Sequence, residues 1–174
     1  MLSGETSVGD FPIEAVKIMA RIIERTEEVA LDQIPPLKHS PATKGGAITK
    51  AATEVGLTVG AKFLVAFTQS GDSARRMSRL RSPIPMLALT PEVGTYNRLA
   101  LSWGVESMLT AVVNHTDEMV MQVDSLLIES KRVNIGDLVL IVAGSPPGIP
   151  GSINAMRVHK IGDAVSGVAP AYRK

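Results

Sequence analysis

Short, almost wholly apolar runs that alternate with stretches of helical periodicity constrain this fold more than any other feature of the sequence. Three of these runs, 63–67, 85–89 and 138–143, have the length of a strand. A strand that is apolar on both faces is typical of a parallel sheet lying between two layers of helices. The alternation therefore predicts an α/β fold with three layers, in which an open, mostly parallel sheet carries helices on both faces.

The same periodicities place the remaining elements. Two more strands are expected at 104–109 and 155–161, which makes the sheet five-stranded. The last strand follows its neighbour through a loop too short for a helical crossover, so it is expected to run antiparallel at an edge. Helices are expected at 11–31, 43–55, 74–80, 92–101 and 116–131.

The ends of the first two helices carry recognisable signals. Residues 1–10 are interpreted as a polar loop, after which Asp10 is placed to cap the first helix and Pro12 fits its first turn. Gly56 is placed to end the second helix.

Composition excludes several classes of function. The net charge is +1 and aromatic residues make up 3%, which argues against a nucleic-acid partner. The absence of cysteine excludes disulfides and thiolate metal sites and favours the cytoplasm. No apolar run approaches the roughly 18 residues of a membrane helix. The three histidines are far apart, and no Ser–His–Asp set or pair of clustered carboxylates is visible, so neither a metal site nor a catalytic residue is predicted.

Proline content divides the chain. Three prolines fall in residues 32–41, which we interpret as a linker between a short N-terminal piece, 1–31, and one α/β domain, 42–162. Residues 163–174 are expected to be a flexible tail. A chain of 174 residues has room for one ordinary domain plus a fragment.

Two loops are candidates for binding, because ligands in open α/β sheets bind beyond the carboxyl ends of the strands. The first loop offers three hydroxyls, a flexible glycine and the start of a helix, which together suit an anion. The alternative is an ordinary turn with Asp72 or Ser73 as the helix cap. The residues of this loop are Thr68, Gln69, Ser70, Gly71, Asp72 and Ser73.

The second loop, 144–154, holds three glycines and three prolines. Such a loop is able to close over a ligand bound beside the first one. The alternative is a rigid turn that leads into an edge strand.

Four arginines and one tryptophan are weaker candidates. Trp103 is interpreted as a packing residue rather than a platform for a ligand. The arginines form either a solvated helix face or a subunit contact. They are Arg75, Arg76, Arg79 and Arg81.

Several motifs resemble the pyruvate kinase family. The run MLSGETSVGDFPIEAV at 1–16 is similar to the stretch that ends the family's catalytic barrel. TQSGDSA at 68–74 resembles the family's TxSGxSA loop, and PIPMLALT at 83–90 resembles the strand that follows it. Gly136-Asp137 and NAMRV at 154–158 resemble later family segments, so the likeness covers about 1–162. The pair TQSGDS and AGSPPG is most like actinobacterial members.

The resemblance implies which parts of a longer protein are present. It makes residues 1–31 the C-terminal remnant of a (β/α)8 barrel and residues 42–162 the family's C-terminal α/β domain. Met1 corresponds to an internal family methionine, so the chain is expected to begin in the middle of its parent. The family moves a phosphoryl group from phosphoenolpyruvate to ADP with magnesium and potassium. Its chemical groups lie upstream of the segments matched here, so this chain is expected to hold no cofactor and to be inactive alone.

The resemblance also implies two roles for the α/β domain: binding an allosteric phosphorylated effector and building a homotetramer together with the enzyme's own barrel. The loop 68–73 becomes the phosphate cradle, and Gly148, Gly151 and Ser152 become the closing effector loop. A negative charge at Asp72 and the proline-rich second loop disfavour fructose 1,6-bisphosphate. A sugar monophosphate or AMP is favoured instead, held by hydroxyls, backbone amides and Arg75 or Arg76.

Two other functions stay open at this point. The domain is alternatively a structural, oligomerising unit with no ligand of its own. A free-standing phosphate-ester enzyme that uses Asp72 is the third reading, although it lacks a plausible metal cluster. Ligand binding distinguishes the effector-binding domain from the structural domain, and turnover of a phosphate ester tests the enzyme hypothesis.

Overall fold

The computed structural model describes residues 2–33, 35, 42–149 and 151–164, and the chain divides into two compact units, 1–36 and 37–174. Most of the predicted linker and residues 165–174 of the predicted tail lie outside the described residues. Residues Leu31–Gln33, at the predicted junction of the first helix and the linker, form a 3-10 turn, η1. Each unit is described separately below.

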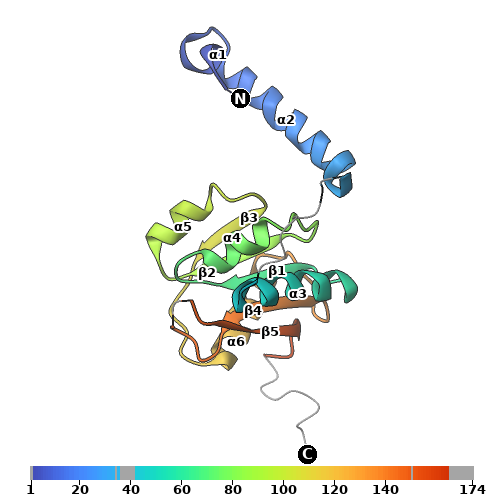
Figure 1. The fold of residues 1–174 in the computed structure, drawn as a ribbon, viewed down its shortest axis with the longest axis vertical. Helices are drawn as coiled ribbons and strands as arrows, with labels where there is room; N and C mark the ends of the chain where they lie inside the picture. Colours follow the sequence, from blue (N-terminus) through green and yellow to red (C-terminus); the bar gives the residue numbers. More distant parts are fainter. Residues whose placement is uncertain (1, 34, 36–41, 150, 165–174) are drawn as a thin grey trace, which may run out of the picture. The chain divides into compact units, whose positions relative to one another are not determined.

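The N-terminal unit consists of two helices, α1 (Gly4–Val8) and α2 (Pro12–Ala30) (Figure 1). The prediction of a loop before Asp10 is wrong for α1, because local polar contacts close a short helical turn. Thr6 Oγ1 donates to the carbonyl of Ser3 (2.8 Å), and Glu5 Oε1 accepts the amide of Phe11 (2.6 Å). Phe11, not Asp10, takes the cap position of α2, and Pro12 is its first residue as predicted.

The second unit contains the predicted five-stranded sheet. The strands are β1 (Phe63–Phe67), β2 (Met86–Thr90), β3 (Val105–Leu109), β4 (Leu138–Gly144) and β5 (Ile153–Lys160). Their order across the sheet is β3-β2-β1-β4-β5. The first four strands run parallel, and β5 pairs antiparallel with β4 at the edge. The α/β fold with one antiparallel edge strand is therefore confirmed.

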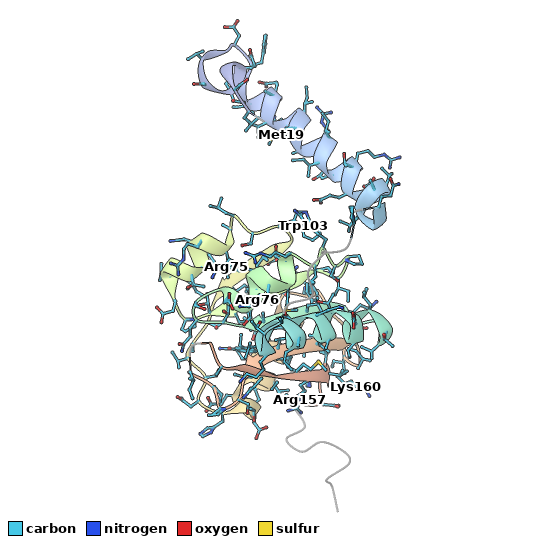
Figure 2. All side chains as sticks on the ribbon, viewed as in Figure 1. Met19, Arg75, Arg76, Trp103, Arg157 and Lys160 are labelled. Carbon is cyan, nitrogen blue, oxygen red and sulfur yellow. The ribbon has the colours of Figure 1, made fainter. Side chains whose placement is uncertain are left out.

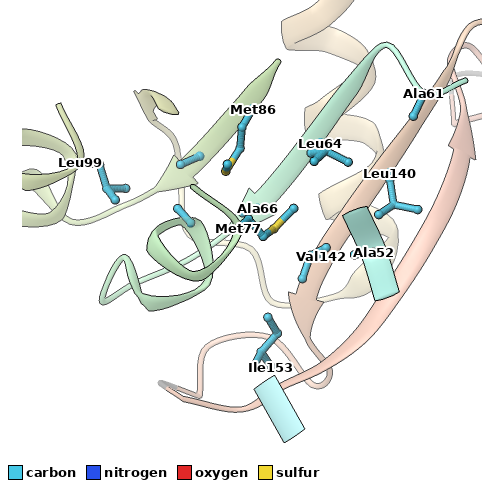
Figure 3. Close-up of a cluster of buried hydrophobic side chains, with 12 residues drawn as sticks. Ala52, Ala61, Leu64, Ala66, Met77, Met86, Leu99, Leu140, Val142 and Ile153 are labelled. Carbon is cyan, nitrogen blue, oxygen red and sulfur yellow. The ribbon is translucent and has the colours of Figure 1, made fainter. Parts of the chain in front are cut away.

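Helices cover both faces of this sheet, as the apolar strands predict. Helix α3 (Lys44–Thr58), α4 (Asp72–Ser78) and α5 (Val93–Leu99) contribute to the core on one face, and α6 (Thr116–Glu129) contributes to the core on the other. Alternate residues of β1 serve the two cores. Leu64 and Ala66 join the first, drawn in Figure 3, and Phe63 and Val65 join the second. Burying each large side chain contributes about 1.5–3 kcal/mol.

Helix α3 runs past the glycine expected to end it. Gly56 is buried, and a Cβ there would lie 2.8 Å from Leu64 Cδ2, so this glycine lets the helix approach β1 closely. The helix ends at Thr58, followed by Val59 and by Gly60 with φ +67°. The terminating glycine is therefore Gly60.

The other predicted element ends differ from the observed ones by one or two residues. Helix α4 begins and ends two residues early, and α6 ends at Glu129 rather than at 131. Strand β5 begins two residues early, because Ile153 already pairs with Gly144 across an irregularity in the ladder. Glu118 lies in the first turn of α6, and its Oε2 accepts the amide of Asn114 in the segment before the helix (2.7 Å). This hydrogen bond lowers the pKa of the Glu118 carboxyl. No helix among the described residues is long and apolar enough to span a membrane.

Candidate functional site

A cavity lies beyond the carboxyl ends of β1, β2 and β4, and both candidate loops line it. The volume of the cavity that is open to the centre of a water molecule is about 80 Å³. Chain order reverses between β1 and β4, which is the place where open α/β sheets bind ligands. Of the predicted residues, those that line the cavity are Thr68, Gln69, Ser70, Asp72, Ser73, Gly148, Gly151 and Ser152.

Gly71 shapes the first loop without lining the cavity. Its amide donates to Thr68 Oγ1 (2.9 Å), and its φ of +82° turns the chain from β1 into α4. A Cβ at this position would meet Arg75 Nη1 and Thr95 Cγ2, each at 3.3 Å. The expectation that Asp72 or Ser73 caps the helix is wrong, because Gly71 holds the cap position and no side chain caps α4. This finding does not decide between an ordinary turn and an anion site.

Two residues that sequence reasoning missed hold the first loop in place. Thr95, which is 2% exposed on α5, donates from Oγ1 to the carbonyl of Gln69 (2.5 Å). Arg98 Nη2 in turn donates to Thr95 Oγ1 (3.1 Å). Thr95 follows Gln69 by 26 residues, so no local sequence pattern connects them.

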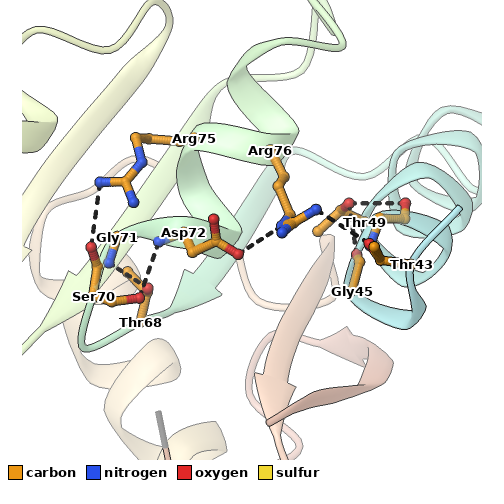
Figure 4. Close-up of polar contacts among 10 residues, drawn as sticks. Thr43, Gly45, Thr49, Thr68, Ser70, Gly71, Asp72, Arg75 and Arg76 are labelled. Atoms are coloured by element: carbon orange, nitrogen blue, oxygen red, sulfur yellow. Dashed lines mark hydrogen bonds and ion pairs between the residues drawn. The ribbon is translucent and has the colours of Figure 1, made fainter. Parts of the chain in front are cut away.

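Arg75 and Arg76 both lie on α4 (Figure 2). They contact different partners. Arg75 Nη1 donates to the carbonyl of Ser70 (3.3 Å), whereas Arg76 Nε contacts Asp72 Oδ2 (2.6 Å) (Figure 4). Arg76 Nη1 also donates to Thr43 Oγ1 (3.3 Å). Neither arginine lines the cavity, in which Asp72 is the only charged lining residue among those described.

Several neutral hydrogen-bond donors of the two loops have no partner among the described residues. The amides of Ser73 and Ala74, at the start of α4, have no acceptor among the described residues. Ser73 is 9% exposed, and its hydroxyl has no hydrogen-bond partner among the residues that the structure describes. Ser152 Oγ is buried and likewise has no hydrogen-bond partner within the described segments. The first loop is therefore able to donate to an anion, and Ser152 Oγ is an unpaired donor buried beside the same cavity.

The second loop is held by its own ends. The side chain of Asn154 accepts from the amide of Ser145 (2.7 Å) and donates to its carbonyl (2.6 Å). Gly148 and Gly151 have positive φ, so they allow the turn between these ends. A Cβ on Gly144 would collide with Ser152 Oγ, so the absence of a side chain at 144 leaves room for that hydroxyl.

The remaining candidates lie away from the cavity lining. Arg81 stacks on the ring of Trp103 (4.5 Å to the centroid), and the carbonyl of Trp103 accepts from Ser78 Oγ (2.6 Å). Arg79 is exposed. Within 2–33, 35, 42–149 and 151–164, no three His, Asp or Glu side chains gather into a possible metal site.

A doubly wound α/β domain with a cavity at its switch point is a ligand-binding class of fold. Residues 46–159 match the family model described as "Pyruvate kinase, alpha/beta domain". The chain belongs to the pyruvate kinase family.

Individual relatives agree with this assignment. The chain is 50% identical to a pyruvate kinase of Mycobacterium tuberculosis and 44% identical to one of Corynebacterium glutamicum, each over 94% of this chain and 34% of the relative. These two relatives support the predicted actinobacterial type. A crystal structure of a pyruvate kinase from Cryptosporidium parvum is similar with a TM-score of 0.77 and 26% identity, over 92% of this chain and 32% of that one. The chain thus spans about a third of the length of the relatives that it matches.

Proposed function

We propose that this chain is the regulatory and assembly part of a pyruvate kinase, and that its cavity binds a phosphorylated small-molecule effector. The parent enzyme would transfer the phosphoryl group of phosphoenolpyruvate to ADP in the cytoplasm. That chemistry, with its magnesium and potassium, would reside in a barrel outside the matched α/β domain.

One observation carries the proposal: two loops about 75 residues apart in sequence line one cavity at the switch point of the sheet. Both loops present donors without acceptors among the described residues, including the amide of Ser73 and the hydroxyl of Ser152. Charge-assisted hydrogen bonds from such donors to a phosphate are worth about 1.5–3 kcal/mol each.

The charge of the cavity favours an effector with one phosphate. Among the residues that the structure describes, no lysine, arginine or histidine lines the cavity, and Asp72 carries a negative charge. Its wall is otherwise largely apolar, with Val112, Met119 and Ile149 among its members. A sugar monophosphate or AMP fits this chemistry better than fructose 1,6-bisphosphate, whose second phosphate would meet no cation there.

The N-terminal unit supports the assembly role. No residue of α1 or α2 is buried, and Ile18, Ile22 and Val29 of α2 are each more than half exposed. We propose that residues 1–31 are the end of the catalytic barrel and that this apolar face packs against the rest of it. The homotetramer of the parent would add contacts through the α/β unit.

Thermal-shift titration of the chain tests effector binding. The ligands are AMP, glucose 6-phosphate, ribose 5-phosphate and fructose 1,6-bisphosphate. A ligand at about 100 times its Kd adds about 2.7 kcal/mol, which raises the Tm of a chain of this size by about 5–11 °C. Ser73→Ala is expected to reduce the shift, because it removes a donor to a charged group. Ser125→Ala, on the exposed face of α6, is the matched control and is expected to leave the shift unchanged.

The outcome that contradicts the proposal is equally clear. No shift with any of the four ligands, in this chain and in the full-length parent, would favour the structural domain without a ligand. An equal shift in wild type and Ser73→Ala would mean that the chain binds the ligand but that the loop 68–73 is not its phosphate site.

A further inference from the structure

The proposed anion site contains an apparent contradiction in charge. Asp72 is the only charged residue lining the cavity among those described, and it is negative. A bare carboxylate beside a phosphate would repel it. The contacts of Asp72 indicate how the loop avoids this repulsion.

Asp72 is held by a cation from its own helix. Arg76 lies one helical turn further along α4, and its Nε is 2.6 Å from Asp72 Oδ2. Figure 4 shows the carboxylate directed toward Arg76 and away from Ser70. The pair is partly exposed, with 33% of the Arg76 and 45% of the Asp72 side chain accessible.

A second element fixes the position of the guanidinium. Arg76 Nη1 donates to Thr43 Oγ1 (3.3 Å), and the same oxygen accepts the amide of Gly46 at the start of α3 (3.2 Å). Arg76 is therefore anchored between α4 and α3 rather than free to enter the cavity.

We propose that Arg76 is a positioning residue of the anion site: it holds the Asp72 carboxylate turned away from Ser70 and balances its charge. This inference rests on the proposed function. It differs from direct binding of the phosphate by Arg76, because here the arginine acts only through Asp72. If Arg76 contacted the phosphate directly, its removal would weaken binding even with Asp72 neutralised. If it acts only through Asp72, its removal would then have little effect.

The test is a double-mutant cycle in the 174-residue chain, with AMP and inorganic phosphate as the probes. Arg76→Ala is expected to raise the Kd about tenfold, because it leaves an unbalanced carboxylate beside the anion. Asp72→Asn alone is expected to bind as well as wild type or better. The double variant is expected to bind within about twofold of Asp72→Asn, because no charge remains to be balanced.

Two further measurements separate charge from folding. The loss in Arg76→Ala is expected to shrink as salt rises from low to about 0.5 M, because screening weakens repulsion between exposed charges. Arg79→Ala, an exposed arginine on the same segment, is the control for a general loss of positive charge and is expected to change the Kd less than twofold. All variants are expected to keep a Tm within about 2 °C of wild type, since an exposed ion pair contributes little stability.

The outcomes distinguish this inference from the function on which it depends. No binding of either probe by wild type and Asp72→Asn overturns both. Binding by wild type, with the double variant as weak as Arg76→Ala, overturns only the positioning role and indicates direct contact. An unchanged Kd in Arg76→Ala also overturns it.

Discussion

Asp124 and His159 form a buried polar contact that lies outside the proposed site. Their side chains are 0% and 2% exposed, and His159 Nε2 lies 2.6 Å from Asp124 Oδ1. The other carboxylate oxygen accepts the amides of Gly162 (3.0 Å) and Ala164 (3.2 Å). One aspartate therefore joins α6 to β5 and to the segment that follows β5.

We expect Asp124→Ala to lower the free energy of unfolding by about 3 kcal/mol, because it leaves a buried imidazole and two amides without an acceptor. Urea unfolding followed by circular dichroism measures this change. Glu129→Ala, on an exposed position of the same helix, is the control and is expected to stay within about 0.5 kcal/mol. A loss below about 1 kcal/mol in Asp124→Ala would mean that water replaces the carboxylate.

At the scale of elements, the hairpin of β4 and β5 brings Gly144 against Ser152. We expect Gly144→Ala to push the Ser152 hydroxyl from its place, to destabilise the domain by about 1–3 kcal/mol and to weaken effector binding. The double variant Gly144→Ala/Ser152→Ala is expected to recover stability but not affinity. Chemical unfolding and the thermal-shift titration measure the two effects separately.

Gly94→Ala is the matched control for this substitution. Gly94 lies in α5, and apart from its chain neighbours and its own helix backbone no atom of the described residues lies within 4 Å of the place that a Cβ would take. Alanine there is expected to be neutral or stabilising by up to about 1 kcal/mol. Normal effector affinity in Gly144→Ala would contradict a role for Ser152.

The elements also mark how far sequence reasoning reached. The apolar runs predicted the three central strands, because a strand covered on both faces tolerates few polar residues. The two edge strands, β3 and β5, are partly exposed and were placed from the rest of the sequence pattern. Helix ends were less certain: Gly56 has the composition of a helix terminator but serves close packing against Leu64. The cap expected at Asp10 is wrong: Phe11 takes the cap position, no side chain caps α2, and the carboxylate of Glu5 accepts the amide of Phe11. Such choices depend on tertiary neighbours that local patterns do not contain.

The candidate site was predictable to a similar degree. Each loop could be identified from its own residues, and the switch-point rule predicts that they lie at one edge of the sheet. The support of Gln69 by Thr95 and the pairing of Asp72 with Arg76 were not predicted. The first joins distant positions, and the second depends on which of several nearby arginines faces the carboxylate.

At the scale of the whole molecule, both hydrophobic cores consist of residues from the α/β unit. No residue of α1 or α2 is buried. We therefore expect deletion of residues 1–41 to leave the Tm within about 3 °C and the effector-induced shift intact. Differential scanning fluorimetry of the shortened chain measures both. A Tm lower by about 10 °C would contradict the independence of the α/β unit.

The cavity draws its walls from segments between Phe67 and Ile153, which cover most of the α/β unit and include the start of its last strand. A nascent chain therefore has no complete pocket until this last strand has left the ribosome and paired with β4. The ligand is consequently unable to act as an early template for folding. Only fully folded molecules would bind the ligand, so the fraction of a preparation that binds effector would equal the fraction that is correctly folded.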